Sequence, residues 1–260
     1  GEGADILRGG NGNDIYVLDD ELDIIQDGGS SSDKDQIIVR FEVLTYTLPD
    51  SITNLTLSSS VFNGTGNTGS NTITGNNGDN IRNGLSGNDT LDGGLGNDRL
   101  VGGSGRDTAL FSSGNNTINL GTTVRQDTGD GRDILTGIEN VNGGGGNDII
   151  TGSRYANTLN GGNGNDTLNG GLGNDRLTGG LGNDTLTGGN GNDIFQINTG
   201  AGRDVINDYG TGNDRIKLLG GITENDLTFS YVGGHTRIKD DEGDLLAIVQ
   251  NTIAEDITFI

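Results

Sequence analysis

Aspartates recur along this chain at steps of nine residues, each at the end of a glycine-rich hexad. Strict Gly-Gly-x-Gly-x-Asp copies begin at residues 9, 93, 102, 143, 161, 170, 179 and 188, and weaker copies begin at 66, 75, 84 and 152. Carboxylate and backbone carbonyl oxygens in a turn are hard ligands, and the chain has no Cys and a single His. Such ligands favour Ca²⁺, whereas Mg²⁺ holds its waters and demands stricter geometry. The hexads therefore predict calcium chemistry.

The three residues after each hexad read as a short strand that must position it. Strand side chains alternate, so only the eighth residue of each nonamer points inward. The inward residues we expect are Leu91, Leu100, Leu168, Leu177, Leu186, Ile81, Ile150, Leu159 and Phe195. Glycines at positions 1, 2 and 4 supply positive φ and leave the carbonyls unshielded. Two successive nonamers then form one coil, with two parallel strands facing each other through a thin apolar layer.

Stacking such coils brings the aspartate of one copy close to the aspartate two copies further along. The coils would lie ~4.8 Å apart, the distance between neighbouring strands. A column of carboxylates at that spacing is strongly repulsive, so a cation must lie between them.

Composition agrees with a repeat stabilised by cations. Of 260 residues, 51 are Gly and only 29% are hydrophobic, and the net charge is −22. This composition is typical of disorder unless a small core is shared between neighbouring repeats or cations bind. The acidic charge disfavours nucleic acid as a partner. No apolar run approaches the ~18 residues of a transmembrane segment.

Enzymatic chemistry finds no support in these residues. His235 lies in an expected hairpin, YVGGHTRI, where an exposed turn histidine is the simpler reading. The chain lacks the HExxH and GxSxG sequences of metalloproteases and lipases. We therefore expect a non-catalytic module, with a larger secreted enzyme as one setting for it.

Breaks in the nonamer pattern suggest five segments. Residues 1–65 hold truncated repeats and an irregular β segment, and residues 66–110 form a first repeat block. Residues 111–142 are expected as an irregular connecting coil before the second block, 143–196. Residues 197–260 have more apolar β-hairpin runs and are expected to cap the stack. The chain begins without Met or a signal peptide, so we expect it to be an excerpt whose natural N-terminal part is missing.

The copies GGNGNDTLN, GGLGNDRLT and GGLGNDTLT resemble the GGxGxDxUx repeats of the RTX (repeats-in-toxin) family. The resemblance covers residues 66–110 and 143–196 directly and residues 1–17 at a truncated edge. It implies an all-β fold, a right-handed parallel β-roll filled with Ca²⁺. It also implies that each ion is shared between one copy and the second copy after it. The first of these gives its Asp and the carbonyls of positions 2 and 4, and the other gives its Asp and the carbonyls of positions 1 and 3.

Carried onto this sequence, the scheme implies four facing sets. They are Gly144, Gly146 and Asp148 with Gly161, Asn163 and Asp166; Gly162, Gly164 and Asp166 with Gly179, Leu181 and Asp184; Gly171, Gly173 and Asp175 with Gly188, Asn190 and Asp193; and Leu85, Gly87 and Asp89 with Gly102, Ser104 and Asp107. Further metal candidates are Asp14, Asp98, Gly180, Gly182, Gly189 and Gly191, with Asp204 and Asp214 extending the columns into the cap. About six Ca²⁺ ions are implied, roughly +12 against −22. Sites that use Asn80 or Asn157 should be weaker or empty.

The family also implies a setting. Related proteins are secreted through a type I channel guided by an uncleaved C-terminal signal, and the ending DITFI resembles that of serralysin-type proteases, although a terminal strand would look the same. We expect a secreted or cell-surface module that folds when it meets extracellular Ca²⁺. Alternatives are a polysaccharide-binding module, as in alginate epimerases, and a structural segment of an adhesin or surface layer.

Overall fold

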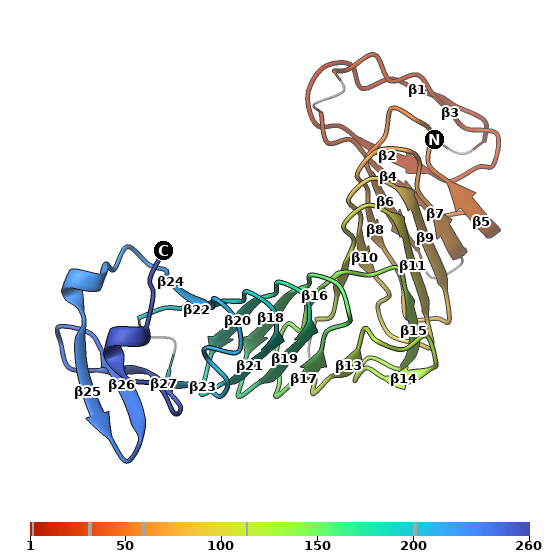
Figure 1. The fold of residues 1–260 in the computed structure, drawn as a ribbon. Helices are drawn as coiled ribbons and strands as arrows, with labels where there is room; N and C mark the ends of the chain where they lie inside the picture. Colours follow the sequence, from red (N-terminus) through yellow and green to blue (C-terminus); the bar gives the residue numbers. More distant parts are fainter. Residues whose placement is uncertain (2, 31–32, 59–60, 113, 200–201) are drawn as a thin grey trace. The chain divides into compact units, whose positions relative to one another are not determined.

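The computed structural model describes residues 1, 3–30, 33–58, 61–112, 114–199 and 202–260. Its regular elements are β-strands with two 3₁₀ turns, η1 (Glu224–Asp226) and η2 (Ala254–Asp256) (Figure 1). The chain forms two compact units. The first comprises residues 1–110, 123–125 and 130–138, and the second comprises residues 111–122, 126–129 and 139–260. The expected all-β parallel solenoid is confirmed in each.

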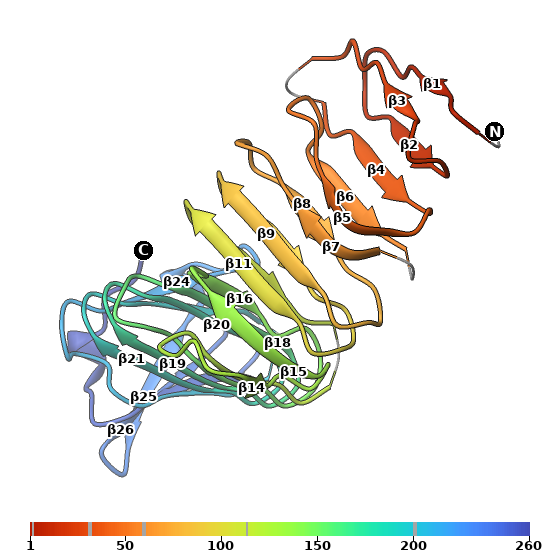
Figure 2. The same ribbon diagram turned by 90° about the vertical axis from the view of Figure 1, so that its right-hand side faces the viewer.

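The first unit contains two parallel sheets whose strands alternate along the chain (Figure 2). One sheet runs in the order β2 (Ile15–Leu18), β4 (Gln36–Val39), β6 (Asn54–Leu57), β8 (Thr72–Thr74), β10 (Thr90–Asp92) and β12 (Thr108–Leu110). The other runs in the order β5 (Val43–Thr47), β7 (Val61–Thr65), β9 (Ile81–Ser86), β11 (Arg99–Ser104) and β15 (Arg132–Thr136). A short parallel pair, β1 (Ile6–Leu7) and β3 (Ile24–Ile25), lies apart from both. The irregular β segment expected within residues 1–65 thus supplies strands β4 to β7 to the stack.

The second unit repeats this arrangement. One sheet holds β16 (Asn140–Asn142), β18 (Thr158–Asn163), β20 (Arg176–Leu181), β22 (Ile194–Ile197) and β24 (Arg215–Leu218). The other holds β13 (Thr117–Asn119), β17 (Ile149–Thr151), β19 (Thr167–Leu172), β21 (Thr185–Asn190), β23 (Asp204–Ile206) and β27 (Leu245–Val249). A short strand, β14 (Gln126–Asp127), also belongs to this unit.

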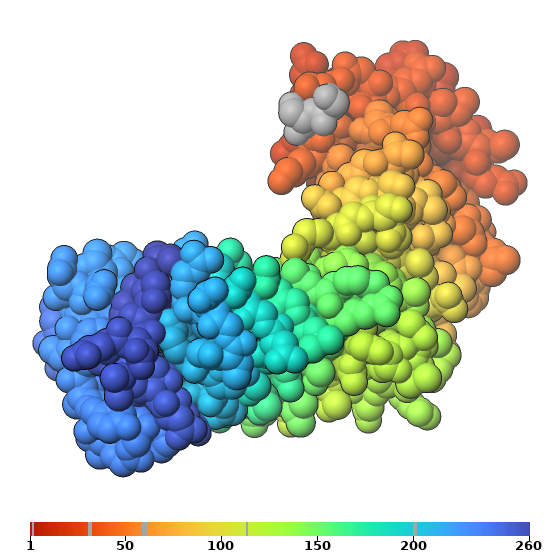
Figure 3. Space-filling model, in the orientation of Figure 1, coloured from red at the N-terminus to blue at the C-terminus, as the bar shows by residue number. Residues whose placement is uncertain are grey.

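The C-terminal segment ends the second sheet with antiparallel strands. Strand β26 (His235–Lys239) pairs with β27 on one side and with β25 (Thr228–Val232) on the other. Gly233 and Gly234 close the β25–β26 hairpin with φ of 64° and 91°. The C-terminal segment lies at one end of the second unit and is coloured blue in Figure 3. No helix among the described residues is long and apolar enough to cross a membrane.

In the strict repeats one inward apolar residue per strand makes the core, whereas β2, β4, β6 and β22 each bury two apolar residues on the same face. Parallel pairing in steps of two nonamers places Leu159 beside Leu177 and Leu168 beside Leu186, and all four are 0% exposed. The expectation for Ile81 is wrong, because its side chain is 45% exposed. Ile81 is the seventh residue of its copy, so the eighth residue, Arg82, points inward and is 0% exposed.

The strands of the second block are longer than the three residues expected. Strands β18, β19, β20 and β21 each span six residues and run through the first two glycines of the next hexad. Ladder hydrogen bonds continue there, with Asn163 N donating to Gly144 O at 2.8 Å and Gly146 N donating to Asn163 O at 2.8 Å. Glycine permits this because positive φ carries no Cβ penalty. Neighbouring hexads are therefore held in close register.

Candidate calcium-binding turns

Aspartates at position 6 form a ladder along each edge of the coils. The backbone N–H of Asp148 donates to Asp166 Oδ1 at 2.7 Å, and that of Asp166 donates to Asp184 Oδ1 at 2.8 Å. On the opposite edge, Asp175 N donates to Asp193 Oδ1 at 2.7 Å. Each coil contains two nonamers, so the side chain of one copy reaches the backbone of the copy two before it. We call these residues the ladder aspartates.

The second carboxylate oxygen of the ladder aspartates is buried without a hydrogen-bond donor. Among the described residues this holds for Asp14, Asp35, Asp89, Asp98, Asp148, Asp166, Asp175, Asp184 and Asp193. Burying a carboxylate oxygen with no partner is costly, and paired or metal-bound burial is the usual solution. The repeated Oδ2 atoms therefore mark places where a cation fits.

Burial also changes the acidity of these groups. It raises the pKa of Asp89, Asp166 and Asp175 to about 6 each, and the charge of the next ladder carboxylate acts in the same direction. Burial raises the pKa of Asp98 to about 7. A bound divalent cation would reverse this effect because it stabilises the ionised form.

Glycine at position 1 leaves the space in which the ligand oxygens meet. A Cβ on Gly161 would lie 2.1 Å from Asp166 Oδ2 and 2.7 Å from the carbonyl oxygen of Gly179. The same holds at Gly84, where a Cβ would lie 2.2 Å from Asp89 Oδ2 and 2.6 Å from Gly102 O. A carboxylate of one copy and a carbonyl of the second copy after it thus converge on one point. This donor set and cradle fit Ca²⁺.

The structure brings together all four facing sets expected from the sequence. The position 4 N–H of the earlier copy donates to the position 3 carbonyl of the later copy in each. The distances are 2.8 Å for Gly146 to Asn163, 2.7 Å for Gly164 to Leu181, 2.9 Å for Gly173 to Asn190 and 2.9 Å for Gly87 to Ser104. A carbonyl oxygen has a second lone pair, so these bonds leave it able to bind a metal ion.

The ladders extend into the C-terminal segment. Asp184 N donates to Asp204 Oδ1 at 3.2 Å, and Asp193 N donates to Asp214 Oδ1 at 2.9 Å. The carbonyl of Gly182 faces Gly202 and that of Gly191 faces Gly212, since a Cβ on the later glycine would lie 1.8 and 1.6 Å from them. Residues 200–201 of the GAGRD turn lie outside the described residues.

Another carboxylate at the same edge holds Gly189, the position 2 candidate of its copy. Asp208 accepts hydrogen bonds from Gly188 N at 2.8 Å and from Gly189 N at 2.7 Å. It fixes the two glycines at the start of the last hexad. The expected position 2 candidate Gly180 has a backbone counterpart too, because a Cβ there would lie 1.9 Å from Gly162 O.

Two ladder members escaped the sequence analysis because insertions hide their spacing. Asp14 N donates to Asp35 Oδ1 at 2.8 Å across 21 residues, and Asp98 N donates to Asp133 Oδ1 at 2.6 Å across 35. Neither Asp35 nor Asp133 ends a strict hexad. Asp133 ends the degenerate hexad TGDGRD, which keeps the glycines of positions 2 and 4, so this pattern was the signal for it. For Asp35 the signal was its place directly before the strand-like run QIIV.

Asparagine at position 5 forms a second ladder, which the sequence analysis also missed. Asn165 N donates to Asn147 Oδ1 at 2.7 Å, and Asn183 N donates to Asn165 Oδ1 at 2.8 Å. This ladder runs in the opposite sense, since the side chain of the earlier copy accepts from the later one. The Asn-Asp pair of each hexad therefore binds both neighbouring coils.

Asparagine at position 6 places amide hydrogens where other copies have only oxygen. Asn80 Nδ2 donates to Phe62 O at 2.7 Å, and Asn157 Nδ2 donates to Glu139 O at 2.8 Å. Asn116 Nδ2 donates to Asp148 Oδ1 and to Gly143 O, both at 2.9 Å. An amide that donates to such oxygens competes with a cation for them, so the weakness expected of the Asn80 and Asn157 sites stays a prediction with a structural reason.

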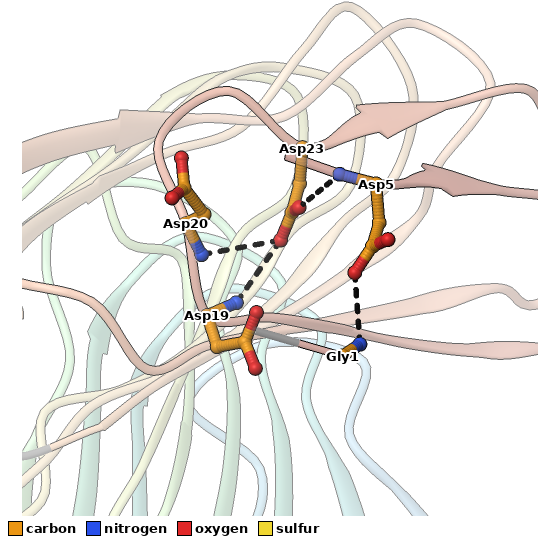
Figure 4. A network of polar contacts seen from close by, with 5 residues as sticks. All are labelled: Gly1, Asp5, Asp19, Asp20 and Asp23. Atoms are coloured by element: carbon orange, nitrogen blue, oxygen red, sulfur yellow. Dashed lines mark hydrogen bonds and ion pairs between the residues drawn. The ribbon is translucent and has the colours of Figure 1, made fainter. Parts of the chain in front are cut away.

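An acidic group lies at the first turn, where the ladder begins (Figure 4). Asp5 N donates to Asp23 Oδ1 at 2.9 Å, again at the separation of two nonamers. Asp23 Oδ2 accepts from Asp19 N at 3.1 Å and from Asp20 N at 3.2 Å. The N-terminal amine donates to Asp5 Oδ2 at 2.8 Å. Backbone hydrogens satisfy both carboxylate oxygens of Asp23, unlike the buried Oδ2 atoms further along.

Comparison with known proteins agrees with this arrangement. The RTX calcium-binding nonapeptide repeat (4 copies) family matches residues 1–25, 64–81, 83–118, 142–177 and 170–206, together more than half of the chain. The chain belongs to this family, and it is a calcium-binding β-roll module.

Sequence comparison with curated proteins finds no match. Among solved structures, the chain is similar to the extracellular lipase LipA from Serratia marcescens, with 17% identity and a TM-score of 0.34. The likeness covers 87% of this chain and 44% of the lipase, so the chain corresponds to less than half of that protein.

Proposed function

We propose that calcium binding is the folding switch of this module and that the module serves a larger secreted protein. The observation that supports it is the repeated buried Oδ2 atom with no hydrogen-bond donor. A chain with a net charge of −22 and 29% hydrophobic residues gains too little from apolar burial to overcome that cost. Binding free energy then becomes folding free energy.

Sharing of aspartates makes the switch cooperative. Asp166 accepts a hydrogen bond from Asp148 and donates its own N–H to Asp184, so it belongs to two turn pairs. Filling one pair fixes a ligand of the next, which lowers the ordering cost of the second ion. Where Ca²⁺ is scarce, as in the cytosol, charge repulsion keeps the chain extended and fit for export through a type I channel. Extracellular Ca²⁺ folds it.

The test is a calcium titration of the chain, starting in excess chelator and followed by circular dichroism. We expect a cooperative gain of β-structure, with uptake of several ions by calorimetry. Asp166→Asn should raise the calcium concentration at half-folding at least about tenfold, because it removes a charged ligand that belongs to two turn pairs. The matched control is Asp79→Asn, because Asp79 is at position 5, accepts from Asn97 N at 2.8 Å, and is replaced by Asn in other copies. Full β-structure in chelator, unchanged by millimolar Ca²⁺, would contradict the switch.

A second candidate function is contact with an anionic polysaccharide. One observation favours it, a hollow of about 270 Å³ on the second unit whose lining includes Asn160, Thr178, Gln196 and Asn198. Thr178 Oγ1 donates to Gln196 Oε1 at 2.8 Å, so these polar groups are held in place across coils. Retarded migration in an alginate-containing gel would support this function, and Thr178→Val with Gln196→Leu should then abolish the retardation.

A further inference from the structure

A buried arginine occupies one position of the core that is otherwise apolar. Arg82 is 0% exposed and is the eighth residue of the copy at 75–83. It pairs in register with Leu100 of the next coil and with Gly64 of the previous one. A Cβ on Gly64 would lie 3.1 Å from Leu55 and from Ile73, so apolar side chains of the other sheet fill the space beside this glycine.

The guanidinium reaches back to the turn of its own copy. Arg82 Nη2 donates to Asn80 Oδ1 and to the carbonyl oxygen of Gly93, the latter at 3.3 Å. Asn80 is position 6 of the earlier copy, and Gly93 is position 1 of the second copy after it. Arg82 therefore bridges the two kinds of oxygen that converge on the cradle in the other turn pairs.

Comparison with the neighbouring pair locates the guanidinium. At Gly84 a Cβ would meet Asp89 Oδ2 at 2.2 Å and Gly102 O at 2.6 Å. At Gly75, the equivalent glycine, a Cβ would meet Arg82 Nη2 at 1.9 Å and Gly93 O at 2.1 Å. A cationic nitrogen thus stands in the cradle that contains only oxygens in the neighbouring pair.

Charge agrees with this placement. Asp98, position 6 of the later copy, is 1% exposed, and its Oδ2 accepts no hydrogen bond. Burial lowers the pKa of Arg82 to about 10, which leaves the guanidinium charged at neutral pH, and the charges of Asp98 and Asp92 oppose that lowering. Arg82 Nε, Arg82 Nη1 and Asp98 Oδ2 are all buried without a hydrogen-bond partner, so the two charges act on each other at a distance, each favouring the ionised form of the other.

We propose that the Arg82 guanidinium is a built-in cation that takes the place of a calcium ion between the turns 75–80 and 93–98. The neutral Asn80 fits this role, because one carboxylate from Asp98 balances a single positive charge, whereas two carboxylates balance a divalent ion. One turn pair of the first unit is therefore closed without calcium. The inference rests on the proposed function, since it assigns a calcium-free member to a calcium-dependent stack.

The first test counts bound calcium by native mass spectrometry at saturating Ca²⁺. The double variant Asn80→Asp with Arg82→Leu gives this copy the aspartate at position 6 and the leucine at position 8 that the strict copies 93–101 and 161–169 have. We expect it to bind one more ion than the unmodified chain. An unchanged ion count in the double variant would overturn the inference, while ion binding by the unmodified chain would leave the proposed function intact.

The second test removes the cation alone. Arg82→Leu leaves the buried Asp98 without the opposing charge of Arg82, so we expect half-folding to need at least about fivefold more calcium. The matched control is Arg99→Leu, which removes the same charge from an exposed side chain of the next coil. Equal calcium midpoints for these two variants would overturn the inference.

A third test uses the unmodified chain, so it does not depend on a variant that folds. Crystals grown with calcium should give an anomalous peak between the turns 84–89 and 102–107. They should give none between the turns 75–80 and 93–98. A peak coordinated by Asn80 and Asp98 would overturn the inference.

Discussion

Each hexad residue has a task set by the coil next to it. Asp166 accepts from the coil before, Asn165 accepts from the coil after, and Gly161 keeps clear the space into which Asp166 Oδ2 and Gly179 O point. The strict Gly-Gly-x-Gly-Asn-Asp pattern is therefore required by contacts between copies in neighbouring coils. A single copy has none of these partners.

Position 4 offers a test of how closely the coils approach. Gly164 has a φ of +133°, and a Cβ there would lie 1.7 Å from Gly146 O, so Gly164→Ala must separate two coils. We expect it to destabilise the calcium-loaded chain by at least about 2 kcal/mol, measured by urea unfolding. Gly12 is the same position of the first copy, with a φ of +103° and no atom within 4 Å of its Cβ. Gly12→Ala should lower the free energy of unfolding only through the strain of a positive φ at a residue with a Cβ, by about 1 kcal/mol. Equal decreases for the two variants would exclude the close approach of the coils as the cause.

At the scale of the element, each six-residue strand from β18 to β21 contributes one apolar side chain to the core. Leu159, Leu168, Leu177 and Leu186 are fully buried, while their neighbours at positions 7 and 9 are half-buried or exposed. Such a strand buries too little apolar area to be stable by itself, so the coils stabilise one another. Arg82 can lie in this apolar layer because its guanidinium reaches the turn and donates to the carbonyl oxygen of Gly93.

Truncation of one strand residue should therefore weaken the stack strongly. Leu168→Ala removes a fully buried side chain between Ile150 and Leu186, and we expect a loss of about 2–5 kcal/mol. The control is Leu181→Ala at the end of β20, where the side chain is 55% exposed, with an expected change within about 0.5 kcal/mol. Urea unfolding in saturating calcium measures both. Similar losses would contradict the single-residue core.

At the scale of the whole molecule, the net charge of −22 is not spread evenly over the surface. Part of it lies in columns of buried carboxylates, and burial raises their pKa. Protons and calcium therefore compete for the same groups. The ion-free fold is least costly when these carboxyls are protonated, and its stability falls as the pH rises through their raised pKa values.

Calcium affinity should accordingly depend on pH. Since burial raises the pKa of Asp166 and Asp175 to about 6, we expect the affinity to fall steeply as the pH drops from about 8 to below about 6. Calcium binding at about pH 6 should release protons, and binding at about pH 8 should release few. Calorimetry in two buffers of different ionisation enthalpy measures that release. A calcium affinity that does not change between these pH values would show that the carboxylates are not the ligands.

The sequence by itself determined the parts of this protein that repeat locally. The nine-residue period, the inward leucines, the facing sets such as Asp166 with Asp184, and a calcium chemistry all follow from identical spacing in successive copies. Only the tertiary structure decided which residues meet across insertions. Asp35 joins Asp14 and Asp133 joins Asp98 because strand register aligns them, whatever the length of chain between. The nine-residue frame itself places Ile81 at position 7 and Arg82 at position 8, but only the structure shows that the Arg82 guanidinium reaches Asn80 Oδ1 and Gly93 O, because that contact depends on the packing of two coils.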